Sequence, residues 1–229
     1  PDDMNAVEAA LALKDELGCK VVAFTMGPPP AEGMLRELMA MGVDEGVLIT
    51  AREFGGSDTY ATSQIIAAGI DTYGVDEDDV ILAGRQAIDG DTAQVGPQVA
   101  EDLDIPQVTY AWEVWPTEDG KSVRVKKELE DGFEILEMAC PCAVTVTKPD
   151  YEPRFPTIKS KMAANKAKIP VLNAADCGLD VERSGLKGSP TNIFKSFTPP
   201  QKGQGKMLEG ADKATCDELV AELQKKHII

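Results

Sequence analysis

The 229-residue sequence predicts an α/β fold, in which a parallel sheet carries helices on both faces and is extended by antiparallel strands. Residues 20–103 support this class, because short apolar runs alternate there with helical patterns over short connections. After Pro106 the chain is rich in β-forming residues, with tight turns at Glu118-Asp119-Gly120 and Glu130-Asp131-Gly132. Residues 149–210 are rich in Pro, Gly, Lys and Ser and show little periodicity, which favours a functional or partner-wrapping segment.

The individual elements follow from the spacing of the apolar residues. The chain opens with an amphipathic helix that ends near Leu17, and since a doubly wound domain normally begins with a strand, we expect a strand before Pro1. Strands are expected at residues 20–25, 46–50, 80–83, 107–115, 122–128, 133–138 and 143–147. Further helices are expected at residues 31–41, from 58 through 66, at 95–103, near 158–167 and from Thr215 onward.

Composition and charge narrow the class of partner. The 23 basic and 39 acidic residues give a net charge of −16, which argues against binding to nucleic acid or a membrane surface. Residues 159–206 are an exception with an excess of lysine and arginine, which suggests docking to an acidic surface or to phosphates, or else a solvated loop. Five cysteines without framework spacing, one histidine and no run of membrane-spanning length predict a cytoplasmic protein with reduced thiols.

The most informative stretch is the connection after the apolar run at residues 80–83. A loop of small, polar and acidic residues leads from Gly84 into a helix whose first turn contains Gly96 and Pro97. Loop amides and a helix N-terminus together can cradle a phosphate or pyrophosphate. The loop has neither of the two common nucleotide-binding glycine patterns, and an ordinary connection between strand and helix remains the alternative.

Side-chain catalysis finds little support in the sequence. With His227 as the only histidine there is no His-based triad, and neither a GxSxG nor an HExxH motif is present. Asp89 and Asp91 could hold a metal or exchange protons, but clustered loop carboxylates more often cap local amides, and we favour that role. Any chemistry is therefore expected to come from a bound cofactor that the protein orients.

Two motifs resemble the β subunit of electron transfer flavoproteins, and the similarity extends over essentially the whole chain. They read GRQAIDGDTAQVGPQVAEDLDIPQVTYA and, further on, EPRFPTIKSKMAANKAKIP. The resemblance implies a Rossmann-like (adenine-nucleotide α-hydrolase-like) sheet and a heterodimer with an α subunit that carries an electron-shuttling FAD. The implied cofactor-binding residues are Asp2 and Asp3 (within Pro1 to Asp3), Met26, and Gly84, Arg85, Gln86, Ala87, Ile88, Asp89, Gly90, Asp91, Thr92, Ala93, Gln94, Val95 and Gly96.

The same resemblance favours FAD over AMP as the nucleotide of this subunit. The loop of this chain resembles the loop of the electron-bifurcating branch of the family. In that branch NADH gives a hydride to the flavin of this subunit. One electron then goes to ferredoxin or flavodoxin, and the other through the α-subunit FAD to an acyl-CoA dehydrogenase-like flavoenzyme. Gly90 lets the backbone approach a larger ligand, and Thr92 and Gln94 offer neutral hydrogen bonds. Asp58, Thr59 and Thr62 are expected to contact the nucleotide or NADH, with simple N-capping as the alternative.

The second motif resembles the family's recognition loop, whose aliphatic anchor enters a pocket on the partner dehydrogenase. Ile158 matches that anchor although leucine is usual there, and Arg154, Thr157 and Lys159 are expected to take part in docking. Judged without the resemblance, an isolated isoleucine beside a helix start is more often a core residue.

The implied organisation has three parts: a nucleotide-binding α/β domain with its β extension at residues 1–148, a recognition loop and extended arm at 149–210, and a C-terminal helix at 211–229. Two other functions stay open on sequence grounds. The subunit could hold a structural AMP and act only as an electron-transfer adaptor, or the chain could be a non-redox adenine-nucleotide-binding module. The long basic segment after residue 149 argues against the module, because a self-contained binding domain would not need it.

Overall fold

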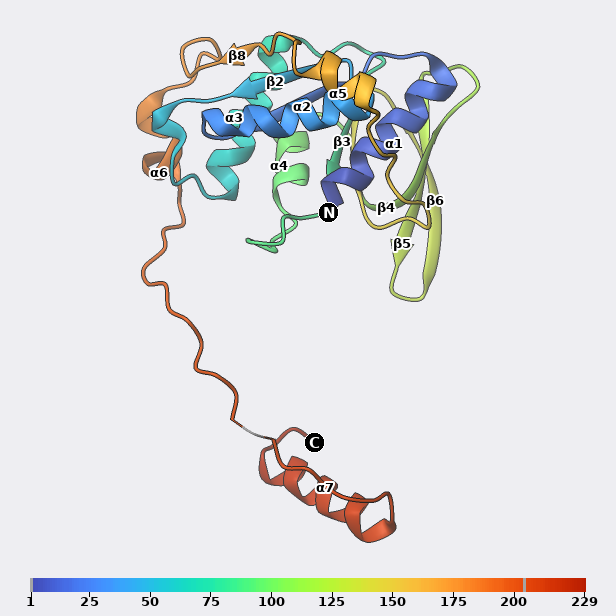
Figure 1. The fold of residues 1–229 in the computed structure, drawn as a ribbon, viewed down its shortest axis with the longest axis vertical. Helices are drawn as coiled ribbons and strands as arrows, with labels where there is room; N and C mark the ends of the chain where they lie inside the picture. The colour runs from blue at the N-terminus through green and yellow to red at the C-terminus, as the bar shows by residue number, and fades with distance from the viewer. Residues whose placement is uncertain (1, 204) are drawn as a thin grey trace. The chain divides into compact units, whose positions relative to one another are not determined.

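The computed structural model describes residues 2–203 and 205–229 of the chain. By their contacts the residues divide into two units, one that ends at Asn192 and one from Ile193 to Ile229. The larger unit contains all of the strands and most of the helices. Figure 1 shows both units, and each is described here by itself.

A first, parallel sheet has the strand order β1-β2-β8. It consists of β1 (Val22–Met26), β2 (Glu45–Ile49) and β8 (Val171–Leu172). The helix α2 (Glu32–Met41) connects the first two strands and packs Leu35 so closely on Gly46 that an added Cβ at this glycine would lie 2.9 Å from the leucine Cβ. Val47, Leu48 and Ile49 are buried, as expected for a strand covered on both faces.

A second, mixed sheet has the strand order β3-β7-β4-β5-β6. The strands β3 (Val80–Gly84), β7 (Cys142–Val146) and β4 (Gln107–Pro116) are parallel to one another. Two antiparallel strands, β5 (Ser122–Leu129) and β6 (Gly132–Ala139), extend the sheet beyond β4. All five residues of β7 are buried, which makes it the most enclosed strand of this sheet. The predicted α/β class, with a parallel sheet and an antiparallel extension, is thus confirmed.

One difference from the sequence prediction is that the strands form two hydrogen-bonded sheets and not one extended sheet. Among the described residues, β1 is an edge strand of the first sheet and β3 is an edge strand of the second sheet. The two sheets are joined by side-chain packing, because Phe24 of β1 and Ile81 of β3 contact the same cluster around Ala67, Ile70 and Val99.

Helices α1 (Asp2–Leu17), α3 (Thr59–Tyr73) and α4 (Val95–Asp102) cover the sheets. Ala6 and Ala9 of α1 pack against Val146, while Leu11 packs against Val43 in a neighbouring cluster. On α3, the closest approach is at Gly69, where an added Cβ would lie 2.3 Å from Ile49 Cδ1. Small residues on α1 and α3 therefore allow both helices to lie close to the strands.

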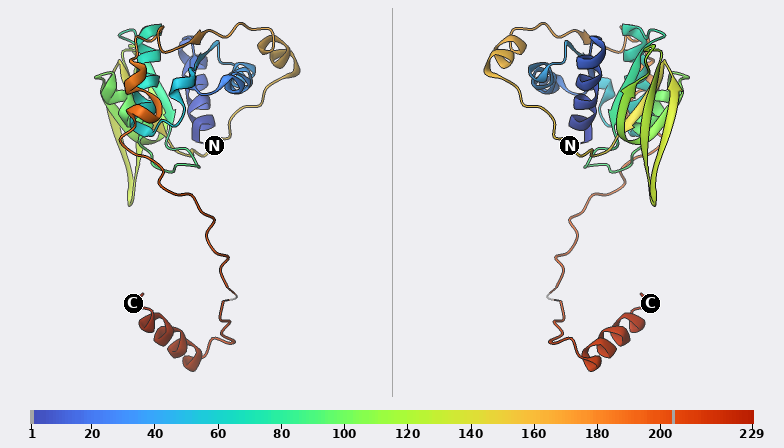
Figure 2. Two further views of the ribbon diagram at one scale, coloured as in Figure 1. Left: turned by 90° about the vertical axis from the view of Figure 1, so that its left-hand side faces the viewer. Right: turned by 90° about the vertical axis from the view of Figure 1, so that its right-hand side faces the viewer.

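The rest of the larger unit is irregular chain with short elements. Two 3-10 turns, η1 (Pro29–Ala31) and η2 (Arg52–Phe54), follow β1 and β2. The predicted short helix near residues 158–167 is present as α5 (Ile158–Ala164), and η3 (Val181–Arg183) and α6 (Gly185–Gly188) follow β8. Figure 2 shows α5 standing outside α2, at a distance from both sheets.

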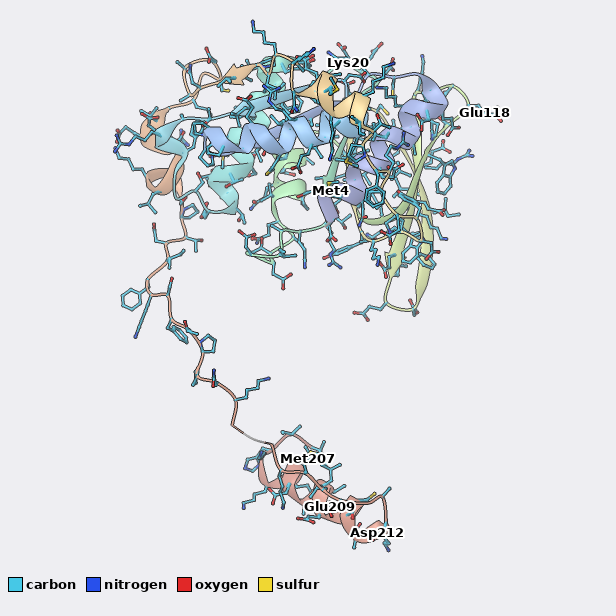
Figure 3. The ribbon with its side chains drawn as sticks, in the orientation of Figure 1. Met4, Lys20, Glu118, Met207, Glu209 and Asp212 are labelled. Atoms are coloured by element: carbon cyan, nitrogen blue, oxygen red, sulfur yellow. The ribbon has the colours of Figure 1, made fainter. Side chains whose placement is uncertain are left out.

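The second unit contains one helix, α7 (Lys213–Lys225), and no described residue of this helix is buried. The side chains of Met207, Glu209 and Asp212, which precede this helix in the sequence, are exposed (Figure 3). No helix among the described residues is both long and apolar enough to cross a membrane.

Candidate functional site

Two helices begin at the end of the larger unit where β3 and β7 finish. β3 ends at Gly84 and its parallel neighbour β7 at Val146. The first turns of α1 and α4 reach this edge: an added Cβ at Gly84 would meet Asp3, and one at Gly96 would meet Thr145. Met4 marks the end of α1 on this side and Lys20 follows its other end (Figure 3). Helix N-termini carry partial positive charge, so this edge is suited to an anion.

The start of α1 is fixed to the end of β3. The Gly84 amide donates to Asp3 Oδ1 at 3.1 Å, and an added Cβ at Gly84 would lie 2.5 Å from the Asp3 nitrogen. Arg85 Nε lies 3.3 Å from Asp2 Oδ2. The structure therefore brings the predicted Asp2 and Asp3 to the predicted loop, although they are more than 80 positions away in the sequence. Pro1, the first residue of that predicted group, lies outside the described residues.

The connection between β3 and α4, residues 85–94, is called here the β3–α4 loop. Its shape is set by Asp91, whose carboxylate accepts from the Gln86 side-chain amide and whose own amide donates to the Ala87 carbonyl at 2.9 Å. Asp91 and Ala93 both have φ at 53°, a conformation that Asp tolerates better than Ala. The Asp91 carboxylate thus bonds within its own loop, but to the Gln86 side chain and not to a backbone amide as the capping role expected from the sequence would require.

Backbone amides of this loop are available to a ligand. Among the described residues, none accepts a hydrogen bond from the amides of Asp89, Gly90 and Thr92. An added Cβ at Gly90 would meet nothing within 4 Å, so the space above this residue is open. Ile88 is exposed at the same loop. The loop thus has unpaired backbone donors and open space beside Gly90, two features of a phosphate-binding loop.

The loop enters α4 against β7. An added Cβ at Gly96 would lie 2.6 Å from Thr145 Cγ2, so only glycine permits this close approach. Arg85 Nε makes no hydrogen bond among the described residues, although it lies 3.3 Å from the Asp2 carboxylate, and the buried Gln98 Oε1 of α4 has no hydrogen-bond partner there. Unpaired buried polar atoms are rare in folded proteins and favour a ligand that would pair with them.

The start of α3 is held by Asp58. Its Oδ1 accepts from the Ala61 amide at 3.0 Å and its Oδ2 from the Thr191 amide at 2.9 Å, while its own amide donates to Ser189 Oγ at 2.8 Å. Burial alone would raise the pKa of Asp58, but the amides of Ala61 and Thr191 outweigh it and hold that pKa below its usual range. This is the N-capping role that the sequence left open for Asp58, with a second bond to the chain that precedes Ile193.

The remaining predicted residues take different places. Thr59 Oγ1 donates to Gln94 Oε1 at 3.2 Å, which ties α3 to the β3–α4 loop. The Thr62 amide donates to the Asp58 carbonyl within the helix. Met26 ends β1 and packs against the cluster that contains Ile49 and Phe54. Thr59 is thus the α3 side chain that bonds to the loop.

The second predicted group lies on α5 and on the segment before it, residues 147–157, called here the β7–α5 segment. Thr157 forms a capping box with Ser160, so that α5 begins at Ile158. Ile158 is 83% exposed, which overturns the expectation from its local sequence that it belongs to the core. Arg154 points inward and bonds to Glu8 and Asp15 of α1, while Lys159 is exposed.

The sequence did not reveal which residues hold Arg154 and Asp58 in place. Glu8 binds Arg154 from 146 positions away, and Thr191 binds Asp58 from 133 positions away. No local pattern announces such pairs, because they depend on how the elements pack. Among the described residues, no three His, Cys, Asp or Glu side chains gather in a way that could hold a metal ion.

The chain matches a known family and close relatives over its length. Residues 1–177 match the electron transfer flavoprotein domain. The chain is 56% identical, over 234 residues, to acryloyl-CoA reductase electron transfer subunit gamma of Anaerotignum propionicum, with 100% of this chain and 87% of that protein covered. Caffeyl-CoA reductase-Etf complex subunit CarD of Acetobacterium woodii is 48% identical over 231 residues, with 100% and 87% covered. Electron transfer flavoprotein subunit beta of Clostridium acetobutylicum is 45% identical over 229 residues, with 100% and 86% covered.

Proposed function

Because the chain belongs to the electron transfer flavoprotein family as a β subunit, we propose that it binds FAD at the β3–α4 loop and transfers electrons from NADH. FAD supplies hydride acceptance and the release of single electrons. In the proposed heterodimer one electron goes to ferredoxin or flavodoxin. The other goes through the α-subunit FAD to an acyl-CoA dehydrogenase-like flavoenzyme. Two of the relatives are named for acryloyl-CoA and caffeyl-CoA reductases, which supports a partner that acts on CoA thioesters.

The observation that carries the proposal is the set of unpaired donors around the open space at Gly90. The loop amides, the N-termini of α1 and α4 and the Arg85 guanidinium would bind and orient the nucleotide phosphates. Gln98 Oε1, buried and unpaired, would accept a donor from the ligand. Asp2, Asp3, Met26 and Thr59 complete the proposed site. No side chain in it has the role of a general acid or base.

The choice of FAD over AMP rests on room at the loop. Gly90 leaves its side of the loop open, and the neighbouring Thr92 and Ala93 are small, so the backbone can approach a ligand larger than a mononucleotide. A Rossmann-like arrangement of the parallel strands, with the nucleotide at their carboxyl ends, fits this placement. The adaptor function with a structural AMP remains the second candidate, because the same amides would bind an AMP phosphate.

The other parts of the chain are proposed to make protein contacts. Ile158, with Thr157 and Lys159 beside it, would dock on the partner flavoenzyme, while Arg154 would hold the segment in place through Glu8 and Asp15. Residues 149–210 and the C-terminal helix would engage the α subunit. The exposed Phe194 and Phe197 support the second contact, because large apolar side chains in the open mark binding segments.

The nucleotide site can be tested with Gly90→Val in the heterodimer, with Gly132→Val as a matched control at the start of β6. A Cβ at either glycine meets nothing within 4 Å, so neither variant should disturb the fold. We expect Gly90→Val to lose nucleotide from this subunit on purification while Gly132→Val keeps it, as measured by chromatography of the released nucleotides. Full nucleotide content in Gly90→Val would contradict a site at this loop.

A further inference from the structure

Two cysteine side chains meet where β6 gives way to β7. Cys140 follows the last residue of β6, Cys142 is the first residue of β7, and Pro141 lies between them. The backbone bends at Cys140 and Pro141. Both cysteine side chains pack in the same apolar cluster, in which Cys142 is fully buried and Cys140 is partly buried. These two cysteines are called here the thiol pair.

The backbone holds the thiol pair in place from two sides. The Cys140 amide donates to the Lys121 carbonyl at 3.1 Å, and the Cys142 amide donates to the Asp79 carbonyl at 3.2 Å. The fold therefore fixes the chain on both sides of the bend and keeps the two side chains together.

The other three cysteines of the chain have different surroundings. Cys177 packs beside Ile49 and Phe54 in another cluster, while Cys19 and Cys216 are exposed. All five cysteines are free thiols. Cys177 is a matched control for the pair, because it is partly buried as Cys140 is but lies in a different cluster.

The two thiols of the pair differ in acidity. Burial raises the pKa of Cys140, and the charges of Asp78 and Asp79 add to this, while a hydrogen bond from the Cys142 thiol acts in the opposite direction. Burial, and then the proximity of Cys140, raises the pKa of Cys142 to about 12. Because the thiolate is the nucleophilic form of cysteine, the more exposed and more acidic Cys140 is the member of the pair that reacts first.

We propose that Cys140 and Cys142 are a redox-modification site that a hydroperoxide, such as hydrogen peroxide, oxidises to an intrachain disulfide. In the first step the Cys140 thiolate attacks one peroxide oxygen and the O–O bond breaks. The hydroxide that leaves takes a proton from solvent, so that water and a sulfenic acid on Cys140 result. In the second step the Cys142 sulfur attacks the Cys140 sulfur, the S–O bond breaks, and the hydroxyl leaves as water with the Cys142 proton. In total the pair loses two electrons and two protons, and one hydrogen peroxide is reduced to two water molecules.

The spacing of the pair suits a disulfide that is readily made and broken. Disulfides join Cα atoms about 4.4–6.8 Å apart, and two residues of an extended strand span about 6.6 Å, a distance that the bend shortens. A bridge between residues so near in sequence closes a small ring and constrains the unfolded chain little, so it stabilises the fold little. Strained disulfides of this kind are the ones most easily reduced. The modification is therefore expected to be reversible.

The thiol pair lies at the opposite end of β7 from the proposed nucleotide site. Cys142 begins β7 beside Val80, the first residue of β3, whereas Val146 ends it beside Gly84. The proposal therefore does not rest on the proposed function, and its test reads a covalent change in this chain.

The test exposes the heterodimer, first reduced and freed of reductant, to hydrogen peroxide. The remaining thiols are then blocked, and the peptide that contains Cys140 and Cys142 is analysed by mass spectrometry. We expect this peptide to lose the mass of two hydrogen atoms and to regain it with dithiothreitol, and Cys177→Ser should behave as the wild type does. Absence of the disulfide from the wild type in excess peroxide, or a bridge from either cysteine to another chain, would overturn the proposal.

The order of the two steps has its own test. Cys142→Ala removes the second thiol, so the sulfenic acid on Cys140 should persist and be trapped by dimedone. In Cys140→Ser the buried Cys142 should stay unlabelled. Faster labelling of Cys142 in Cys140→Ser than of Cys140 in Cys142→Ala would overturn the assignment of Cys140 as the attacking thiol.

Disulfide formation should also depend on pH, because the Cys140 thiolate attacks the peroxide. Since burial holds the pKa of Cys140 above its ordinary value, the thiolate fraction and the rate should rise about tenfold from pH 7 to pH 8. An equal rate at the two pH values would contradict thiolate attack by this residue.

Discussion

The β3–α4 loop and the β7–α5 segment leave the same edge of the second sheet, because β3 and β7 are parallel neighbours. The loop is tied down at its ends, by Asp3 on Gly84 and by Thr59 on Gln94, and its middle keeps unpaired amides. The segment is fixed in its middle, where the guanidinium and the amide of Arg154 both bond to Glu8.

The difference follows what each connection is proposed to bind. A loop that binds a small anion needs backbone amides that are free to donate to the ligand, so few of these amides can form hydrogen bonds within the loop. A segment that presents apolar side chains to a protein needs no free donors, and a rigid base lowers its cost of binding. Two neighbouring strand ends are thus proposed to serve a small ligand and a protein in opposite ways.

The largest expected effect is at the fixed end of the loop. Gly84→Ala would place a Cβ 2.5 Å from the Asp3 nitrogen and push the start of α1 away. We expect a loss of about 1–3 kcal/mol in the free energy of unfolding, as for other overpacked sites, together with a loss of nucleotide. Gly90→Ala, in open space on the same loop, should leave the urea midpoint unchanged. Equal stability of the two variants would contradict the conclusion that the β3–α4 loop is fixed at its ends and open in its middle.

A smaller effect is expected where the segment is fixed. Glu8→Gln leaves the Arg154 guanidinium half-buried without its counter-charge, and Glu8 itself is only 12% exposed. Since a hydrogen bond to a charged group contributes about 1.5–3 kcal/mol and Arg154 is partly exposed to solvent, we expect a loss of about 1–2 kcal/mol. Arg124→Gln, which breaks a surface pair with Glu137 whose side chains are each about half exposed, is the control and should change stability by less than about 0.5 kcal/mol. A loss in Glu8→Gln no larger than in this control would contradict the role of Arg154.

The smallest effect concerns Asp58, which ties α3 to the chain before Ile193. Asp58→Ala should cost about 1 kcal/mol at pH 7, the usual value of an N-cap. Because the folded state holds the pKa of Asp58 below its ordinary value of about 4, its stabilisation is complete above that value and is lost as the pH falls through the lowered pKa. The difference in urea midpoint between wild type and Asp58→Ala should therefore be constant from pH 5 to 7 and shrink below pH 4. A difference that grows in acid would contradict the bonds assigned to Asp58.

Periodicity and turn chemistry were sufficient to predict most elements. β3 and α4 lie within one residue of their expected bounds, because an apolar run, a small-residue loop and Pro97 mark them locally. The terminal helix begins at Lys213 and not at Thr215, because Asp212 caps it and its carboxylate accepts from the Thr215 amide. Local signals compete at helix ends, so such errors of a few residues are expected.

The long-range geometry of the candidate sites could not be predicted from the sequence. That Ile158 is exposed depends on how α5 rests on α2, where Arg36 bonds to the Ala164 carbonyl across 128 positions. The division into two hydrogen-bonded sheets likewise depends on which strands pair, and hydrophobic patterns do not determine that. The resemblance supplied the proposed functions of the loop and of Ile158, while the structure supplied the residues that hold them in place.

The central claim is that this subunit itself carries a flavin. The most direct test is to purify the heterodimer, denature it and count the released nucleotides by chromatography. The account predicts two FAD per heterodimer, one from each subunit, with no AMP. One FAD with one AMP would contradict it and make this subunit a structural adaptor in electron transfer.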